Sequence, residues 1–131
     1  MHTRIVPVLV ATMMVTGCGG DGDGNGLSVQ AACDGLAETL CERFYACLTP
    51  AEIAAIGYPP TEAGCVTERK TEYGCADVTE ENTCDPNETY HGAKASTCLD
   101  QFGSLECSQI RQPGFDFETA APACGEICTV E

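Results

Sequence analysis

The chain predicts a mostly α-helical, disulfide-rich fold: a small bundle of three to four short helices with long loops, preceded by a signal peptide and a flexible tether. Three observations support this prediction. Eleven cysteines occur among 131 residues, a density typical of secreted disulfide scaffolds. Apolar residues recur at helical spacing in several segments. No stretch alternates β-branched and polar residues as a half-buried strand would.

Residues 1–17 have the features of a bacterial signal peptide. Arg4 and His2 form a short basic region, and residues 5–15 are mostly apolar. This apolar run is too short to cross a bilayer as a helix, which needs about 20 residues. The sequence Val15-Thr16-Gly17-Cys18 follows. We therefore expect residues 1–17 to be cleaved.

The sequence Val15-Thr16-Gly17-Cys18 resembles the lipobox of bacterial lipoproteins. The resemblance implies that the Cys18 thiol carries a diacylglycerol, that cleavage falls before Cys18, and that the new amino group is open to acylation. Two or three acyl chains give stable anchoring, at about 0.8 kcal/mol per buried CH₂. Gly19 in place of Asp matches the outer-membrane sorting rule of some bacterial lipoproteins. The resemblance thus implies a lipid-anchored protein of the cell envelope, in the outer membrane and facing the periplasm or the cell surface.

The cysteine count is consistent with this resemblance. With Cys18 joined to lipid, an even ten cysteines remain, whereas an ordinary secretory signal with a chance cysteine would leave eleven. Leu, Ile, Val and Phe make up under a fifth of the chain after residue 17, so five disulfides at about 2–4 kcal/mol each must compensate for a thin core. The ten cysteines expected in disulfides are Cys33, Cys41, Cys47, Cys65, Cys75, Cys84, Cys98, Cys107, Cys124 and Cys128.

The charge balance excludes some partners. After residue 17 there are 20 acidic residues and five basic ones, the six of the whole chain less Arg4, which gives a net charge of −15. Such a charge argues against nucleic acid as a partner and against direct adhesion to anionic lipid. It suits a self-repelling envelope domain and is compatible with bound divalent cations.

Residues 18–27 are expected to be the lipidated cysteine and a Gly/Asp tether, with the folded domain at 28–131. Glycine supplies flexibility, and aspartate keeps the segment solvated. The Asp-Gly-Asp-Gly-Asn-Gly run of 21–26 also matches the start of an EF-hand calcium loop, but Ala32 stands where the bidentate Glu should be. A plain linker is the preferred interpretation, and calcium binding is the alternative.

Residues 28–48 predict the first helix, with Ser28 as its N-cap. Its apolar face, which we expect to lie in the core, comprises Cys33, Leu36, Leu40, Phe44, Cys47 and Leu48.

Thr49-Pro50-Ala51-Glu52 is a capping box that starts a short second helix ended by Gly57. A third helix is expected from residue 61 to about Tyr73, with Gly74 as its stop.

The second half of the chain is less regular. Residues 76–83 predict a polar surface loop, and a capping pattern at Asp85 predicts a helix over 86–103. Residues 104–110 predict a short helix or turn, and 111–123 predict a loop. Most disulfide connectivity remains open. An antiparallel pairing of the 28–48 and 61–75 helices would favour two bridges, Cys33 with Cys75 and Cys41 with Cys65.

The spacing of the cysteines resembles uncharacterised small cysteine-rich lipoproteins predicted in predatory soil bacteria. The residues that carry it are Cys33-x7-Cys41-x5-Cys47-Leu48, Cys98-x8-Cys107 and Pro122-Ala123-Cys124, behind the lipobox and tether. The resemblance covers most of the chain after residue 17 and implies no known activity.

No catalytic constellation is evident. Thiol redox enzymes use Cys-x-x-Cys, and the nearest pattern, Cys124-x3-Cys128, has one residue too many. The same pair is one possible half-site for zinc. His91, the one histidine after residue 17, has no nucleophile motif nearby and is expected on the surface. We expect no catalytic residue, no cofactor and no metal ligand.

These observations predict a non-enzymatic, lipid-anchored module, bound to the membrane through its anchor and able to contact an envelope or surface protein. One alternative is a binding module for a small apolar ligand or lipid. Lipid-transfer proteins enclose such ligands in a helical disulfide domain, but their adjacent Cys-Cys and Cys-x-Cys motifs are absent here. The second alternative is metal or calcium binding.

Overall fold

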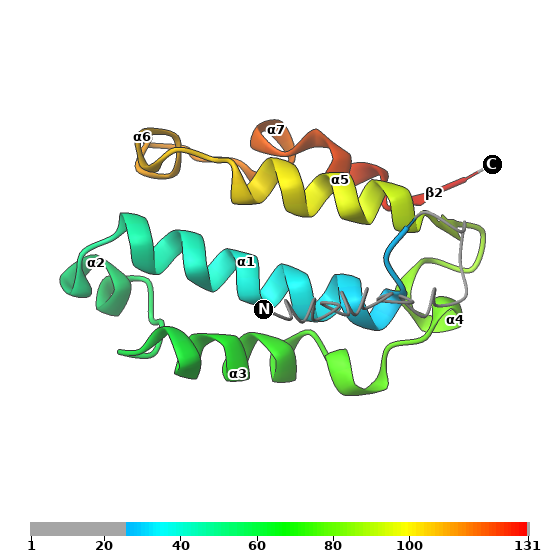
Figure 1. Ribbon diagram of the computed structural model, residues 1–131, viewed down its shortest axis with the longest axis horizontal. Helices are drawn as coiled ribbons and strands as arrows, with labels where there is room; N and C mark the ends of the chain where they lie inside the picture. Colours follow the sequence, from blue (N-terminus) through cyan, green and yellow to red (C-terminus); the bar gives the residue numbers. More distant parts are fainter. Residues whose placement is uncertain (1–25, 131) are drawn as a thin grey trace, which may run out of the picture.

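Three helices form the frame of the molecule. The computed structural model describes residues 26–130, and Figure 1 shows α1 (Val29–Cys47) lying between α3 (Glu62–Glu72) and α5 (Gly92–Gly103). The mostly α-helical, disulfide-stapled fold that the sequence predicts is confirmed. The expected signal peptide, the lipidated Cys18 and the tether up to residue 25 lie outside the described residues.

The first helix begins and ends where local chemistry predicts. The Ser28 hydroxyl accepts a hydrogen bond from the Ala31 N–H (3.2 Å) and so satisfies a free donor of the first turn. The chain becomes extended at Leu48. At Thr49 the capping box starts α2 (Pro50–Ala55): the Thr49 N–H donates to the Glu52 carboxylate at 2.7 Å.

The predicted helix stops are also confirmed. Gly57 follows α2 with φ 77°, and Gly74 follows α3 with φ 65°, a left-handed conformation that glycine adopts without Cβ strain. At the other end of α3, the Thr61 hydroxyl accepts from the Gly64 N–H at 3.1 Å.

The segment 76–83, expected to be a loop, contains helical turns. The 3₁₀ turn η1 (Cys75–Asp77) and the short helix α4 (Glu80–Thr83) occupy most of it. The Thr79 N–H donates to the Asn82 side chain at 2.7 Å, so a polar sequence caps itself without an apolar stripe. The periodicity that reveals longer helices is absent from so short an element.

The segment 111–123 is likewise not a plain loop. It follows α6 (Cys107–Ile110), the short helix expected within 104–110, and contains α7 (Phe117–Ala120). The Asp116 carboxylate accepts from the Thr119 N–H at 2.8 Å, which caps α7. The 3₁₀ helix η2 (Pro122–Glu126) then begins at a proline, whose fixed φ suits a helix start.

The helix expected over 86–103 begins six residues late, at Gly92. The capping residues Asp85 and Glu88 form a turn instead, with the Glu88 N–H bonded to the Asp85 carbonyl at 2.8 Å. The next residues form β1 (Thr89–Tyr90), which pairs antiparallel with β2 (Cys128–Thr129). A partner almost forty residues away therefore overrides the local helix signal.

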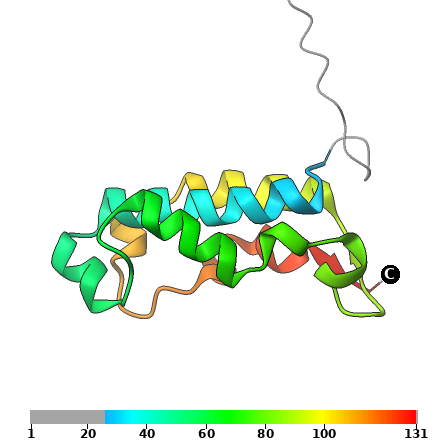
Figure 2. The same ribbon diagram turned by 90° about the horizontal axis from the view of Figure 1, so that it is seen from below.

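The core lies where α1, α5 and the C-terminal segment meet. Figure 2 shows the segment from α6 to β2, coloured orange to red, as a second layer on one side of α1 and α5. Phe102 of α5 is fully buried and stacks on Phe117 with ring centroids 4.3 Å apart. Other buried members of the core are Leu40, Cys41, Cys47, Cys65, Leu105, Ile110 and Ala121.

Candidate functional site: an apolar pocket between α1, α4 and α5

All ten cysteines from Cys33 to Cys128 are joined in five disulfides. Their Cα–Cα distances, 4.6 to 5.9 Å, lie in the usual range. Two of the bridges are those that the antiparallel helix pairing favours. The pairs are Cys33–Cys75, Cys41–Cys65, Cys47–Cys107, Cys84–Cys128 and Cys98–Cys124.

The bridges exclude a shared zinc half-site at Cys124 and Cys128, because these residues pair with different partners, Cys98 and Cys84. Within residues 26–130, no three His, Cys, Asp or Glu side chains gather so that they could hold a metal ion. Most of the calcium-loop match lies outside the described residues, and its last position, Ala32, belongs to α1.

His91 fastens the C-terminal strand. The backbone N–H of His91 donates to the Ile127 carbonyl at 2.8 Å. Its ring Nε2 lies 2.8 Å from the Thr129 hydroxyl. The residue is half-buried. The residue holds β2 beside the start of α5.

An apolar pocket of about 260 Å³ lies at the end of the molecule where α1 begins. On one side it is lined by Val29, Ala32 and Leu36, which lie on successive turns of α1. On the facing side it is lined by Ala95 and Leu99 of α5. The remaining lining comes from the end of α3, from α4 and its approach, from β1 and from the segment before β2: Tyr73, Val78, Asn82, Thr83, Tyr90 and Ile127, with Cys33 and Cys98.

A second hollow of about 300 Å³ continues the first along α1. The two share Leu36, Tyr73, Cys98 and Ile127, and the second adds Leu40, Phe117 and Cys124. Together they form one apolar groove. We call the first hollow the α4 pocket, because α4 and its approach form the wall that distinguishes it.

The polar groups of the α4 pocket carry no charge. Burial raises the pKa of Tyr73. Burial and the nearby negative charge of Glu80 both raise the pKa of Tyr90. The Tyr90 hydroxyl donates to the Leu27 carbonyl at 2.9 Å. Among residues 26–130, the lining side chains are otherwise apolar, disulfide-bonded, amide or hydroxyl, so the pocket suits an apolar molecule.

The sequence did not single out this pocket. Leu36 stands on the predicted core face of the first helix, but Leu36 and Leu99 are both only half-buried where they line the pocket. Tyr73 lies at the very end of the third predicted helix, and Val78 and Ile127 come from segments without helical periodicity. Isolated apolar residues in polar segments, such as Val78 within 76–83, were the one available signal.

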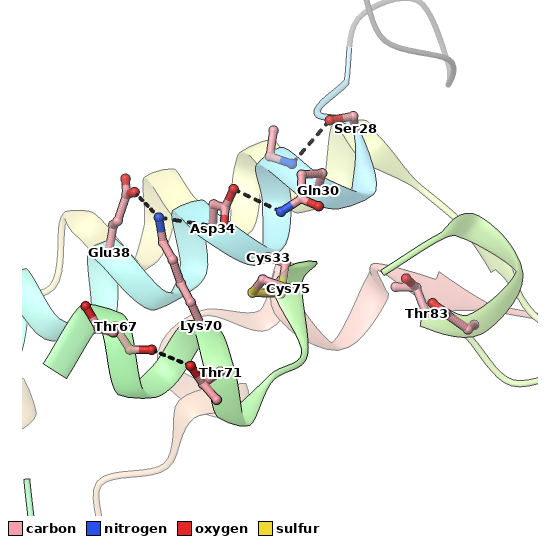
Figure 3. The surroundings of a disulfide bond; sticks show 12 residues. Ser28, Gln30, Cys33, Asp34, Glu38, Thr67, Lys70, Thr71, Cys75 and Thr83 are labelled. Atoms are coloured by element: carbon pink, nitrogen blue, oxygen red, sulfur yellow. Dashed lines mark hydrogen bonds and ion pairs between the residues drawn. A yellow bond between two sulfur atoms is a disulfide. The ribbon is translucent and has the colours of Figure 1, made fainter. Parts of the chain in front are cut away.

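The described basic side chains are all engaged within the domain. Lys70 reaches from α3 to Glu38 (2.7 Å) and Asp34 (3.6 Å) on α1, beside the Cys33–Cys75 bridge (Figure 3). The Arg43 guanidinium donates to the Leu105 carbonyl at 2.6 Å. The other ion pairs are Arg69 with Glu68 and Glu72, Lys94 with Glu126, and Arg111 with Glu52.

None of the helices in the described part of the chain combines the length and the apolar character of a membrane span. Comparisons of the chain with protein-family models, with curated proteins and with solved structures each found no match.

Proposed function

We propose that this protein is a lipid-anchored, non-enzymatic module of the cell envelope, which holds a rigid acidic domain close to the membrane for contact with another envelope protein. The observation that carries the proposal is the short connection between Cys18 and the domain. The Leu27 N–H donates to the Gly92 carbonyl at 3.1 Å, and the Tyr90 hydroxyl donates to the Leu27 carbonyl. Backbone contacts with the domain therefore begin at least as early as Leu27.

This connection limits how far the domain reaches. Seven residues, 19–25, separate Cys18 from Gly26. A fully extended chain covers at most about 3.5 Å per residue, so the domain stays within about 25–30 Å of the anchor. A module held at that distance from a membrane is suited to binding neighbours in the same envelope layer.

The domain also has a surface suited to contact at its far end. Figure 1 places α2 at the C-terminal end of α1, away from the end at which α1 begins. Ile56, at the end of α2, is 47% exposed and lies beside the exposed Ala54 and Ala55. An apolar tip on an acidic domain supports protein contact at the end away from the anchor.

The anchoring part of the proposal is tested by the intact mass of the membrane-extracted protein, with thiol alkylation before and after reduction. We expect an N-terminus at Cys18 with added acyl mass, and no alkylation until reduction opens ten sites. Cys18→Ser should abolish the acyl mass and release the protein from the membrane fraction. An unmodified Cys18 thiol would refute the anchor.

The contact part is tested by photo-crosslinking in cells. A photoreactive amino acid at Ile56 should give one discrete adduct, whereas the same amino acid at the exposed Glu118 of α7 should give none. Adducts from position 118 alone would contradict a role for the α2 tip.

A second candidate function is the binding of a small apolar ligand, and the α4 pocket is the observation that favours it. Organic extraction of the purified protein, followed by mass spectrometry, should recover a bound apolar molecule. Ala32→Leu adds three carbon atoms to the pocket wall and should lower the recovered amount. Ala31→Leu, at the exposed neighbouring position, is the matched control and should leave it unchanged.

A further inference from the structure

The wall of the α4 pocket belongs to a segment with one sign of charge. Residues 77–88 contain five carboxylates and no Lys or Arg. Val78, Asn82 and Thr83 of this segment face the pocket. The carboxylates alternate with them along the chain and lie on the outside, exposed or half-buried: Asp77, Glu80, Glu81, Asp85 and Glu88.

The cations nearest the pocket are each paired with carboxylates. Arg69 lies close enough to Tyr73, a lining residue, for its charge to favour the tyrosinate, but its guanidinium pairs with Glu68 and Glu72. Among residues 26–130, no Lys or Arg lines the α4 pocket. Lys70 and Lys94, which flank the acidic segment in the sequence, pair with carboxylates of their own. Glu80 lies close enough to Tyr90, a lining residue, for its charge to disfavour the tyrosinate. The negative field of the segment therefore extends to the pocket mouth.

We propose that the α4 pocket binds a small cationic amphiphile, whose apolar body fills the pocket and whose amine faces the carboxylates of residues 77–88. The inference rests on the second candidate function. Anionic amphiphiles such as fatty acids are disfavoured, because their carboxylate would meet like charges, and the nearby Arg69 already pairs with Glu68 and Glu72.

The volume sets the size of the apolar body. An apolar cavity of about 150 Å³ holds benzene. The α4 pocket, at about 260 Å³, therefore has room for roughly ten carbon atoms. A longer chain would extend into the second hollow beside Phe117 and Leu40. Molecules that share a ten-carbon chain and differ only in the polar head group are therefore a matched set of probes.

The test uses residues 18–131 with Cys18→Ser, exported into an oxidising compartment, and three probes below their micelle concentrations: decylamine, 1-decanol and decanoate. A carboxylate about 10 Å away changes the affinity for a unit charge about two-fold in water, and several act together. At low salt and neutral pH we expect decylamine to bind tightest, decanol to be intermediate and decanoate to bind at least about ten-fold more weakly than the amine. Physiological salt should reduce the difference in affinity between decylamine and decanoate.

Variants separate the apolar contribution to probe binding from the electrostatic contribution. Glu80→Gln with Glu81→Gln should reduce the amine-to-acid ratio by about four-fold for each carboxylate removed, because the affinities of the amine and the acid shift about two-fold in opposite directions, and should leave decanol unchanged. Glu118→Gln, an exposed carboxylate on α7, should leave the ratio unchanged. Ala32→Leu should weaken all three probes, and Ala31→Leu none.

Different outcomes would overturn the charge preference and the apolar binding site. Decanoate binding as tightly as decylamine would overturn the charge preference and leave an apolar pocket. Failure of all three probes to bind would overturn the second candidate function together with this inference. Equal weakening by Ala31→Leu and Ala32→Leu would place the binding outside the α4 pocket and refute it.

Discussion

Two glycines, Gly26 and Gly92, allow the segment before α1 to cross the first turn of α5. Backbone meets backbone there, because the Leu27 N–H bonds the Gly92 carbonyl at 3.1 Å. A Cβ built on Gly92 would overlap the Leu27 carbonyl oxygen, and one on Gly26 would overlap Gly92 and Ala93. Backbone atoms on both sides leave no flexible side chain to move aside. Glycine is therefore required at this crossing for space.

We expect Gly92→Ala to lower the free energy of unfolding by about 1–3 kcal/mol, the usual cost of forcing atoms into a filled space. The control is Gly103→Ala at the other end of α5, where a Cβ would meet only the Thr39 methyl at 3.7 Å. That change should be neutral or stabilise by up to about 1 kcal/mol. Urea denaturation with the disulfides intact compares the two. Equal effects would show that the crossing is not tightly packed.

Glu52 makes the α2 cap sensitive to acid. The Thr49 N–H that donates to its carboxylate, and then Arg111 beside it at 2.7 Å, hold the pKa of Glu52 below its ordinary value of 4.5. A lowered pKa in the folded state contributes stability above the ordinary value. That contribution is lost as the pH falls through the folded-state pKa.

The difference in unfolding free energy between the wild type and Glu52→Gln should therefore be present near pH 7 and shrink below pH 4.5. Comparing the two proteins removes the general effect of protonating the other carboxylates. Denaturation curves at a series of pH values measure the difference. A difference that grows on acidification would contradict the linkage.

Helix α1 is the element that the bridges organise. Cys33, Cys41 and Cys47 connect it to η1, α3 and α6 in turn. Its length of 19 residues, about 28 Å, lets one helix hold three elements along its axis. The other two bridges hold the C-terminal layer, since they join Cys98 to Cys124 and Cys84 to Cys128.

Two bridges of this framework allow loop closure and burial to be compared. Cys84–Cys128 spans 44 residues and Cys41–Cys65 spans 24, so loop entropy favours the former by about 0.5 kcal/mol. Cys41 and Cys65 are 0% exposed, and removing a buried sulfur leaves a cavity that costs about 1 kcal/mol or more. Burial should therefore outweigh loop length.

We expect Cys41→Ala/Cys65→Ala to destabilise the domain more than Cys84→Ala/Cys128→Ala, by about 1 kcal/mol or more. Equilibrium unfolding of both double variants under oxidising conditions measures this. A larger loss from the Cys84–Cys128 pair would mean that loop closure, or the β1–β2 contact beside it, contributes more than core packing.

The whole molecule is strongly self-repelling. All of its Lys and Arg residues after residue 17 are engaged within the domain, and the net charge of the whole chain is −14. Five covalent bridges hold the compact state against this repulsion.

Salt should therefore stabilise the domain. Between about 0.01 M and 0.15 M NaCl the Debye length falls from about 30 to about 8 Å. This screens the general repulsion more than the short ion pairs. We expect a rise of a few degrees in the thermal midpoint, which corresponds to about 1 kcal/mol. A fall in the midpoint would mean that the ion pairs outweigh the repulsion.

Much of the helical frame was predictable, because the signals that set it are local. Ser28, Thr49 and Thr61 cap helices through hydrogen bonds to N–H groups three residues onward, and Gly57 and Gly74 end them through their own backbone freedom. The pairing of α1 with α3 followed from two such neighbouring helices and the positions of their cysteines.

The rest depended on contacts between distant parts of the chain. Gly92 became the start of α5 because Thr89 and Tyr90 pair with Cys128 and Thr129. The α4 pocket exists because residues from six segments leave a space that none of them defines alone. Local sequence thus set the lipobox-like motif, the main helices, the charge and the number of bridges. The packing of the C-terminal layer set the late helix start, the remaining bridges and the pocket, since these depend on which surfaces meet in three dimensions.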